Sequence, residues 1–233
     1  MAKLTRESAL AHYSKWPFEH HPFWRAVLAG ELSREQILQA EIQHYLRSNV
    51  GRLYRERAAI MSRLIGGELF ELLDQTAREE CQLDESGPSH VDLIRDFLKA
   101  NGVSQATLDQ AIPTPGNAAA IALYKDIADR GPLQHMIGAG CVEYYYSRLS
   151  PKIFESYVNH YGFSEDDAKT YRIHGPMDQT HGERALRVLE TPLAQAMPVE
   201  IDLAIRDAFA ATSLHYDGML QATMTGAGYW SGS

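Results

Sequence analysis

The stretch "SEDDAKTYRIHGPMDQTHGERALRVLE", residues 164–190, has the pattern of one long helix with metal-ligand residue types on one face. Ser164 is a residue type that caps helix N-termini, and the acids after it suit the positive end of the helix dipole. His174, Asp178 and His181 follow at spacings of four and three residues. Because residues three, four and seven apart share one face of a helix, all three side chains can reach one point.

This triplet has two interpretations. Two imidazoles and a carboxylate form a ligand set for non-haem iron, and the same groups bind zinc or manganese. An exposed polar stripe on a surface helix has the same spacing. Pro176 adds a second alternative, because proline disrupts a helix interior but suits its first turn. A helix that begins near His174 would place this histidine at the helix mouth.

The rest of the chain also shows helical periodicity. "SREQILQAEIQHYL" (33–46) opens with a capping-box pair, and its apolar residues recur on one face. Similar patterns occupy residues 67–81, 88–102 and 198–224. Alternating strand patterns are almost absent, and the breaks between helical segments are short. We therefore expect one all-α domain over residues 1–233, a helical bundle of about seven to nine helices, with residues 226–233 as a frayed tail.

Composition limits the function classes. The chain has 233 residues, 45% of them hydrophobic, and a net charge of −8, which argues against nucleic-acid binding. The arginines of "RLYRERAAIMSR" (52–63) do not share one face, so we expect an exposed helix surface there. The sequence has no membrane-span pattern and no secretory signal, and its two cysteines cannot form a disulfide framework. These features predict a cytoplasmic protein without nucleic-acid or membrane partners.

A second candidate ligand is Glu143 in "PLQHMIGAGCVEYYYSRL" (132–149). Each glycine inside a helix costs about 1 kcal/mol relative to alanine, so Gly138 and Gly140 indicate a close helix contact or space for a ligand. A carboxylate on such a helix is expected to be buried, and a buried carboxylate needs a metal, a proton or an ion-pair partner. An arginine such as Arg148 is the structural alternative to a metal.

A third group of candidates lies at a helix–turn–helix corner. Glu79 and Glu80 end one helix, and His90 begins the next after a Gly-Pro turn. Such a corner can return a carboxylate and an imidazole to one point, although an exposed acidic helix end has the same pattern. The apolar periodicity is compatible with either acid facing inward. With residues 143 and 174–181, the chain offers enough ligands for two metal ions that share a bridging carboxylate.

These stretches resemble a known family, the haem-oxygenase-like di-iron oxidases, relatives of pyrroloquinoline-quinone synthase and the thiaminase II proteins. The resemblance covers nearly the whole chain. It rests on "HHPFWRAVLAGELSREQILQAEIQHYLRS" (20–48), "AREECQLDESGPSHVDLIRDFLKANGVS" (77–104), "CVEYYY" (141–146) and "HGPMDQTH" (174–181). It implies a helical bundle of the haem-oxygenase-like type and two iron ions, or iron with manganese. The implied ligands are Glu79, His90, Glu143, His174, Asp178 and His181. The resemblance favours Glu79 over Glu80.

The resemblance also implies an activity. Such an enzyme would use dioxygen, with an external electron donor, on a small amine, amino acid or carboxylate. The outcome would be C–C or C–N cleavage or N-oxygenation. Tyr45 and Tyr144 are candidate catalytic residues near such a cavity, beside His44, and core packing is the alternative for each. One branch of the family converts its own tyrosine to para-aminobenzoate; Trp24 stands at that position here, which argues against self-modification.

Three other functions stay open at this point. A metal-free oxidase resembling pyrroloquinoline-quinone synthase would bind an aromatic polycarboxylate. A thiaminase-like C–N hydrolase would need Cys141 as an exposed, activated nucleophile. A non-enzymatic helical interaction module would carry a polar cluster that only satisfies itself. A homodimer is compatible with each, and the iron content of the protein separates the di-iron enzyme from the others.

Overall fold

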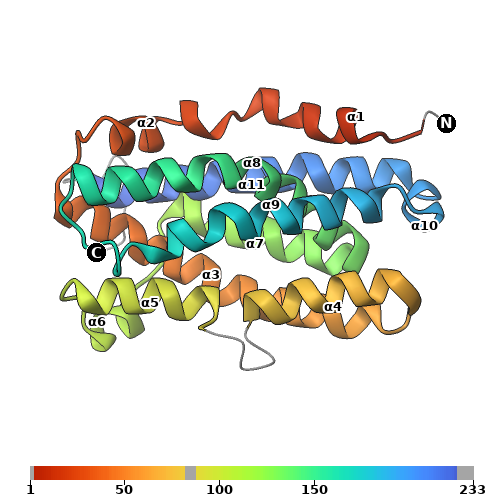
Figure 1. The fold of residues 1–233 in the computed structure, drawn as a ribbon, viewed down its shortest axis with the longest axis horizontal. Helices are drawn as coiled ribbons and strands as arrows, with labels where there is room; N and C mark the ends of the chain where they lie inside the picture. Colours follow the sequence, from red (N-terminus) through yellow and green to blue (C-terminus); the bar gives the residue numbers. More distant parts are fainter. Residues whose placement is uncertain (1–2, 82–87, 225–233) are drawn as a thin grey trace.

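The computed structural model describes residues 3–81 and 88–224 and shows a bundle of helices (Figure 1). No strand occurs in these two ranges, which confirms the all-α prediction. Two 3₁₀ turns, η1 (His12–Lys15) and η2 (Phe18–His20), lie near the start of the chain. The α-helices are α1 (Arg6–Ala11), α2 (Pro22–Leu28), α3 (Arg34–Ser62), α4 (Gly67–Cys81), α5 (His90–Ala100), α6 (Gln105–Gln110), α7 (Pro115–Arg130), α8 (Pro132–Asn159), α9 (Lys169–Leu189), α10 (Pro192–Gln195) and α11 (Pro198–Thr223).

The number of helices exceeds the expected seven to nine. Seven helices in the described part have eleven residues or more, and four short ones raise the total to eleven. The short helices are single turns or little more, and their sequences are too brief for periodicity to reveal them. The expected tail at 226–233 lies outside the described residues. None of the helices in the described ranges is long and apolar enough to cross a membrane.

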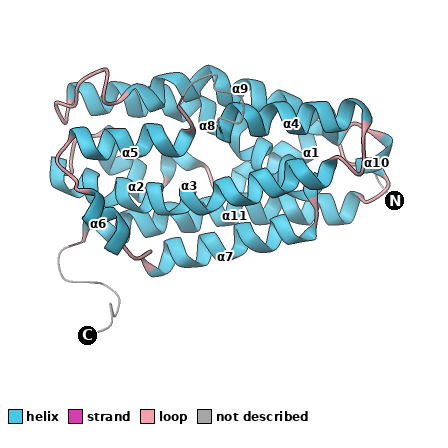
Figure 2. Ribbon diagram, turned by 90° about the horizontal axis from the view of Figure 1, so that it is seen from below, coloured by secondary structure: helices cyan, strands magenta, loops and turns pink. Residues whose placement is uncertain are grey.

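The long helices lie roughly along the longest axis of the molecule (Figures 1 and 2). α4 and α5 follow one another along one side of the bundle, and α3 packs against both of them. α8 pairs with α9, and α11 packs against α7, α8 and α3. Large side chains such as Trp24, Phe97, Ile137 and Phe209 are fully buried between these layers. α3, α4, α5, α8 and α9 therefore face one another across a shared interior.

Glycines bring α8 and α9 into close contact. A Cβ atom at Gly140 would lie 2.1 Å from Cβ of Ala185. A Cβ atom at Gly182 would lie 2.8 Å from Cα of Tyr144. Gly138 makes the same kind of approach to α11, where its Cβ would be 3.0 Å from the carbonyl oxygen of Ala204. Of the two roles expected for Gly138 and Gly140, close helix contact is the one observed.

Helix α9 begins later than expected but continues through Pro176. Ser164 caps a turn, in which its Oγ accepts a hydrogen bond of 3.0 Å from the backbone N–H of Asp167, and the helix begins at Lys169. His174 therefore lies inside the helix and not at its mouth. The face with His174, Asp178 and His181 is buried, with side-chain exposures of 3%, 3% and 0%. The exposed-stripe interpretation is wrong because neighbouring helices cover this face.

Candidate metal centre

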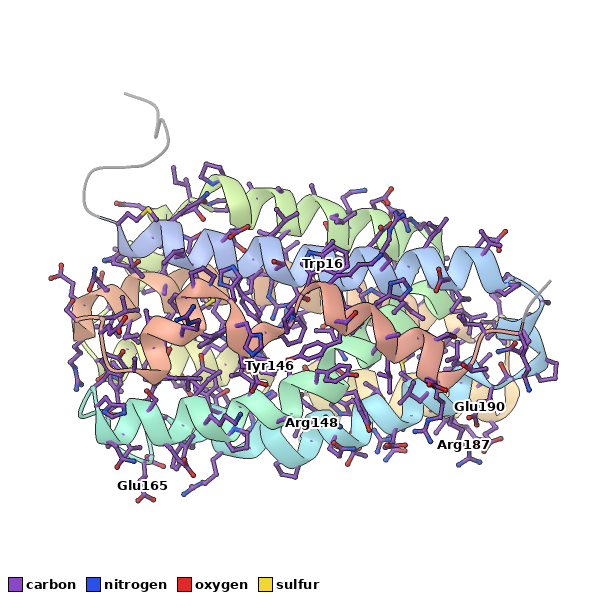
Figure 3. All side chains as sticks on the ribbon, turned by 90° about the horizontal axis from the view of Figure 1, so that it is seen from above. Trp16, Tyr146, Arg148, Glu165, Arg187 and Glu190 are labelled. Atoms are coloured by element: carbon purple, nitrogen blue, oxygen red, sulfur yellow. The ribbon has the colours of Figure 1, made fainter. Side chains whose placement is uncertain are left out.

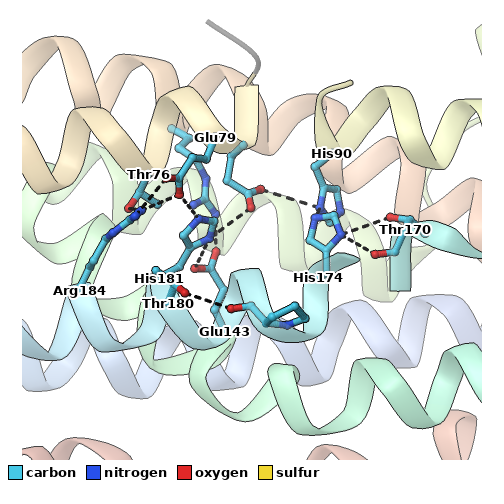
Figure 4. A network of polar contacts seen from close by, with 12 residues as sticks. Thr76, Glu79, His90, Glu143, Thr170, His174, Thr180, His181 and Arg184 are labelled. Carbon is cyan, nitrogen blue, oxygen red and sulfur yellow. Dashed lines mark hydrogen bonds and ion pairs between the residues drawn. The ribbon is translucent and has the colours of Figure 1, made fainter. Parts of the chain in front are cut away.

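The carboxylate of Glu80 lies between two groups of potential metal ligands. In the first group its oxygen lies with ring nitrogens of His90 and His174, and in the second with Asp178 and His181. Within each group, all ligand atoms are within 4.8 Å of one another. The ligands come from the end of α4, the first residue of α5 and one face of α9. Figure 4 shows the two halves of this network, with His90 and His174 facing each other on one side and His181 on the other.

The two neighbouring acids are placed differently from the sequence expectation. The side chain of Glu80 is 10% exposed and lies in the interior, whereas that of Glu79 is 31% exposed. Glu79 forms two hydrogen bonds of 2.6 and 3.0 Å with the guanidinium of Arg184. Its carboxylate also accepts a hydrogen bond of 2.9 Å from Nε2 of His181. Glu79 thus contacts the outer nitrogen of His181, and Glu80 lies 3.3 Å from the inner one, Nδ1.

Glu143 approaches the same histidine from α8. Its Oε2 is 3.5 Å from Nδ1 of His181, and its Oε1 accepts a hydrogen bond of 2.6 Å from Arg55. Arg148, the partner considered from the sequence, lies over the rings of Tyr144 and Tyr145 instead. The expectation of an exposed surface for Arg55 is wrong as well, because its side chain points inward and is only 20% exposed. Arg55 balances part of the negative charge at this end of the centre.

Hydrogen bonds fix which nitrogen of His174 carries a proton. Nδ1 of His174 lies 2.7 Å from the backbone carbonyl oxygen of Thr170, so this nitrogen must donate. Its Nε2 then holds a lone pair, and this atom faces Nδ1 of His90. A backbone carbonyl behind an imidazole is a common support for a metal-binding histidine.

A second hydrogen-bond chain fixes His90 from the opposite side. Oε1 of Glu41 accepts hydrogen bonds from the hydroxyls of Tyr157 and Tyr171, and its Oε2 lies 3.1 Å from Nδ1 of His44. When His44 is neutral, it donates to Glu41 through Nδ1 and accepts through Nε2, which lies 3.3 Å from Nε2 of His90. His90 donates there, which leaves a lone pair on its Nδ1. The two lone pairs of His90 and His174 face each other, and a cation between them would remove their repulsion.

The second ligand group contains three polar atoms without a hydrogen-bond partner. They are Oε1 of Glu80, Oδ2 of Asp178 and Nδ1 of His181, all buried within the described part of the chain. Such atoms are costly in a protein interior unless a partner is present. All three belong to residues of one ligand group, so this side-chain set fits a metal ion.

The charges of the second group also indicate that its carboxylates need a positive partner. Burial raises the pKa of Asp178 well above its usual range, and repulsion from Glu143 and Glu80 adds to this effect. Burial alone would lower the pKa of His181, but the nearby carboxylates of Glu143 and Glu80, 3.5 and 3.3 Å from its Nδ1, outweigh burial and raise this pKa to about 10. The pKa of Glu80 stays well below its usual range despite burial, because of Arg55 and His181. Without a metal, protons on Asp178 and His181 offset the crowded carboxylates.

A cavity of about 130 Å³ opens beside these ligands. Glu80, His90, Glu143 and Asp178 contribute to its wall, and so does His44. The rest of the wall includes aliphatic residues and several aromatic and basic ones, among them Trp24, Tyr124, Tyr146, Tyr216 and Arg47. Figure 3 shows Tyr146 in the middle of the bundle, whereas Glu165 and Arg187 point outward at its edge. The ligands therefore border a space that a small molecule can occupy.

The two tyrosines expected to be catalytic lie elsewhere. Tyr45 packs against the hydrophobic core, and Tyr144 packs edge-on against Tyr145, below Arg148. The tyrosine that lines the cavity from α8 is Tyr146, two residues after Tyr144. Cys141 is fully buried, and burial raises the pKa of its thiol to about 12. A thiolate nucleophile at Cys141, as the hydrolase alternative needs, is therefore disfavoured.

The sequence interpretation did not find Glu41, although it contained a signal for it. "EIQH" (41–44) is a Glu-x-x-His motif, a spacing that recurs in helical di-iron proteins. In this fold the motif supports His90 from outside, and its residues are not among the grouped ligand atoms of the described chain. The motif therefore marks the region of the centre, and only the tertiary structure gives its role.

An all-α bundle with inward-facing histidines and carboxylates from facing helices is the architecture of a helical metalloprotein. Residues 52–216 match the model of a family described as iron-containing redox enzyme, and this chain belongs to that family. Among curated proteins, it is similar to the 4-aminobenzoate synthase of Chlamydia muridarum, with 27% identity over 177 residues, 73% of this chain and 71% of that protein.

Solved structures confirm the haem-oxygenase-like fold. A domain of unknown function with a heme oxygenase-like fold from Shewanella denitrificans has a TM-score of 0.72 and 16% identity, covering 90% of this chain and 89% of that one. A TenA family transcription regulator from Silicibacter has the same TM-score and 18% identity, with 94% and 95% coverage. A CADD-like protein of unknown function from Nostoc punctiforme has a TM-score of 0.70 and 15% identity, with 94% and 96% coverage. At these identities the likeness shows the fold alone.

Proposed function

We propose that this iron-containing redox enzyme is a non-haem di-iron oxidase that uses dioxygen to oxidise a small metabolite. The observation that supports two ions is the position of Glu80, whose carboxylate belongs to both ligand groups. One group would place an ion between Glu80, His90 and His174. The other would place an ion between Glu80, Asp178 and His181, with Glu143 beside it. Two ferrous ions held there would supply electrons for the reduction of dioxygen, and an external donor would restore them.

Residues of this chain would hold the ligands in position. The carbonyl oxygen of Thr170 orients His174, and His44 orients His90. Glu79, itself held by Arg184, accepts the outer N–H of His181. We therefore assign a positioning role to Glu79 and the role of ligand to Glu80. Carboxylate or carbonyl partners of this kind increase the basicity of metal-binding imidazoles and fix their orientation.

The side chains around the centre also limit its contact with water. His181 is fully buried, and the other five candidate ligand side chains, with Glu80 in place of Glu79, are at most 15% exposed. The cavity beside them is lined mainly by aromatic and aliphatic groups. A substrate in this cavity would meet the ligands from one side only. The small size of the cavity favours a small metabolite over a macromolecule.

The test is the iron content of protein loaded with ferrous iron under anaerobic conditions. We expect close to two iron ions per chain, and consumption of dioxygen when the loaded protein is exposed to it. His181→Ala should lose tight iron binding while the helical content is kept, because it removes a ligand of the second group. His20→Ala, which changes an exposed histidine, is the matched control and should keep the wild-type iron content.

The outcome distinguishes the alternatives. Wild-type iron content in His181→Ala would contradict the assigned centre. Protein without iron that still consumes dioxygen would indicate the metal-free oxidase. Protein without iron and without activity would favour a non-enzymatic helical module.

A further inference from the structure

Arg47 is a cation in the cavity wall that pairs with no anion among residues 3–81 and 88–224. Its Nε atom is buried and makes no hydrogen bond, and no hydrogen bond or ion pair to its guanidinium occurs within residues 3–81 and 88–224. The nearest specific contact is the ring of Tyr124, whose centroid lies 5.5 Å from the guanidinium carbon. The other two arginines of the cavity differ, because Arg52 pairs with Glu56 and Arg55 with Glu143. A partly buried guanidinium without a counter-charge is costly, so this position suits an anionic ligand.

Three ionisable side chains on which Arg47 acts, His215, Tyr146 and Tyr216, are neutral. Burial and the charge of Arg47 lower the pKa of His215 well below its usual range. Burial also keeps the phenols of Tyr146 and Tyr216 un-ionised by raising their pKa well above 10, although Arg47 acts in the opposite direction. A ligand anion beside Arg47 would therefore meet a cation and neutral side chains.

The carboxylates of the metal centre lie further along the same wall. Arg47 and Arg55 are eight residues apart on α3, which corresponds to about 12 Å along the helix axis. Glu143 is paired with Arg55, at the distant end of this interval. The carboxylate of Glu143 is thus separated from Arg47 along the cavity wall, whereas the candidate ligand His90 lies closer to Arg47. An elongated molecule with one charged terminus fits this arrangement.

The volume limits the size of the occupant. A cavity of about 130 Å³ is close to the roughly 150 Å³ known to accommodate benzene. Trp24, Tyr146, Tyr216 and Met219 supply apolar surface for a ring or a short chain. A single ring, or a chain of about six carbons, therefore fits between these side chains.

We propose that the cavity binds a small monocarboxylic acid whose carboxylate pairs with Arg47 while its apolar body extends toward the metal ligands. One guanidinium that pairs with no anion in the described part of the chain matches a monoanion, and its planar fork matches the two oxygens of a carboxylate. This inference rests on the proposed oxidase function, since only that function makes the occupant a substrate.

The test is calorimetric titration of the full chain with benzoate and with benzyl alcohol, a neutral molecule of nearly the same shape. We expect benzoate to bind at least tenfold more tightly than benzyl alcohol. Arg47→Met should weaken benzoate at least tenfold and leave benzyl alcohol unchanged. Arg47→Lys should lose less than Arg47→Met because it keeps the charge, and Arg63→Met, at the exposed C-cap of α3, should behave as wild type. Thermal melts of each variant show whether it is folded.

Each titration is made with iron-loaded and with metal-free protein. Equal binding of benzoate by wild type and folded Arg47→Met overturns the inference. So does benzoate binding that requires iron but not Arg47, because the carboxylate would then bind the metal. Phenyl phosphate that binds more tightly than benzoate would overturn the choice of a carboxylate. If Arg47-dependent binding is found in a protein that holds no iron, the proposed oxidase function fails and the anion site stands alone.

Discussion

Replacing Glu80 and Glu79 by glutamine, one at a time, should have unequal effects on iron binding. Glutamine keeps the size of the side chain and an oxygen acceptor but removes the charge. Glu80 belongs to both ligand groups, so Glu80→Gln weakens the binding of both ions. Among the candidate ligands, Glu79 contacts only His181, at its outer nitrogen. Glu79→Gln therefore keeps every ligand and alters the orientation and basicity of His181.

The expected sizes of the two effects follow from the position of each acid and from the usual cost of losing an outer partner of a metal-binding histidine. Loss of an outer partner of a metal-binding histidine weakens affinity by about 10- to 100-fold, or about 1.4 to 2.8 kcal/mol. Glu79→Gln should therefore still reach two irons per chain at saturating iron, with one of them held more weakly. Glu80→Gln should stay well below one iron per chain under the same conditions.

The assay is anaerobic titration with ferrous iron, followed by removal of free metal and measurement of bound iron. Circular dichroism at each point shows that both variants remain helical. Equal losses in the two variants would refute the assignment of Glu80 as the shared ligand. A larger loss in Glu79→Gln would restore the assignment that the family resemblance favoured.

Two further predictions concern the helix pair that carries the ligands. Gly182→Ala should destabilise the protein by about 1 to 3 kcal/mol in a thermal melt and reduce its iron content, because the added Cβ would lie 2.8 Å from backbone and Cβ atoms of Tyr144. The control is Gly51→Ala, whose Cβ would meet nothing within 4 Å. This variant should be neutral or stabilise the protein by up to about 1 kcal/mol in the same melt. In a Cys81→Ser background, the thiol of Cys141 should not react with a disulfide reagent at pH 8 until the protein is unfolded, because its pKa of about 12 leaves almost no thiolate. Rapid labelling of folded protein would contradict the buried position of Cys141.

Helical periodicity was sufficient to predict the fold class and the ligand-bearing face of α9. The spacing of His174, Asp178 and His181 depends only on local geometry, and the helix runs through Pro176 without moving them off one face. The cost of a glycine inside a helix marked Gly140 as important, but the sequence left two explanations, a close helix contact and space for a ligand. What periodicity could not supply was the start of α9, where a turn precedes the first helical residue, Lys169.

The choice between Glu79 and Glu80 could not be made from local sequence. Neighbouring residues on a helix point about 100° apart, and the apolar positions of α4 are compatible with either acid facing inward. The tertiary structure favours Glu80 as the inward-facing acid, because Arg184, 105 residues further along the chain, pairs with Glu79. The same holds for Glu143, whose partner Arg55 comes from α3, 88 residues away. The pairing of each acid with an arginine depends on the tertiary structure and cannot be predicted from neighbouring residues.

The arrangement of the ligands also links the centre to the stability of one side of the bundle. α9 is held against α8 by contacts that need no metal, such as the approach of Gly140 to Ala185. Glu80 and His90 come from the facing ends of α4 and α5, and their polar atoms point toward His181 and His174. An ion in each ligand group would therefore join α4 and α5 to α9. Without the ions, lone pairs face each other in the first group and partly neutralised carboxylates meet in the second. Because binding energy of this kind adds to the free energy of folding, the iron would stabilise the α4–α5 side of the bundle in particular.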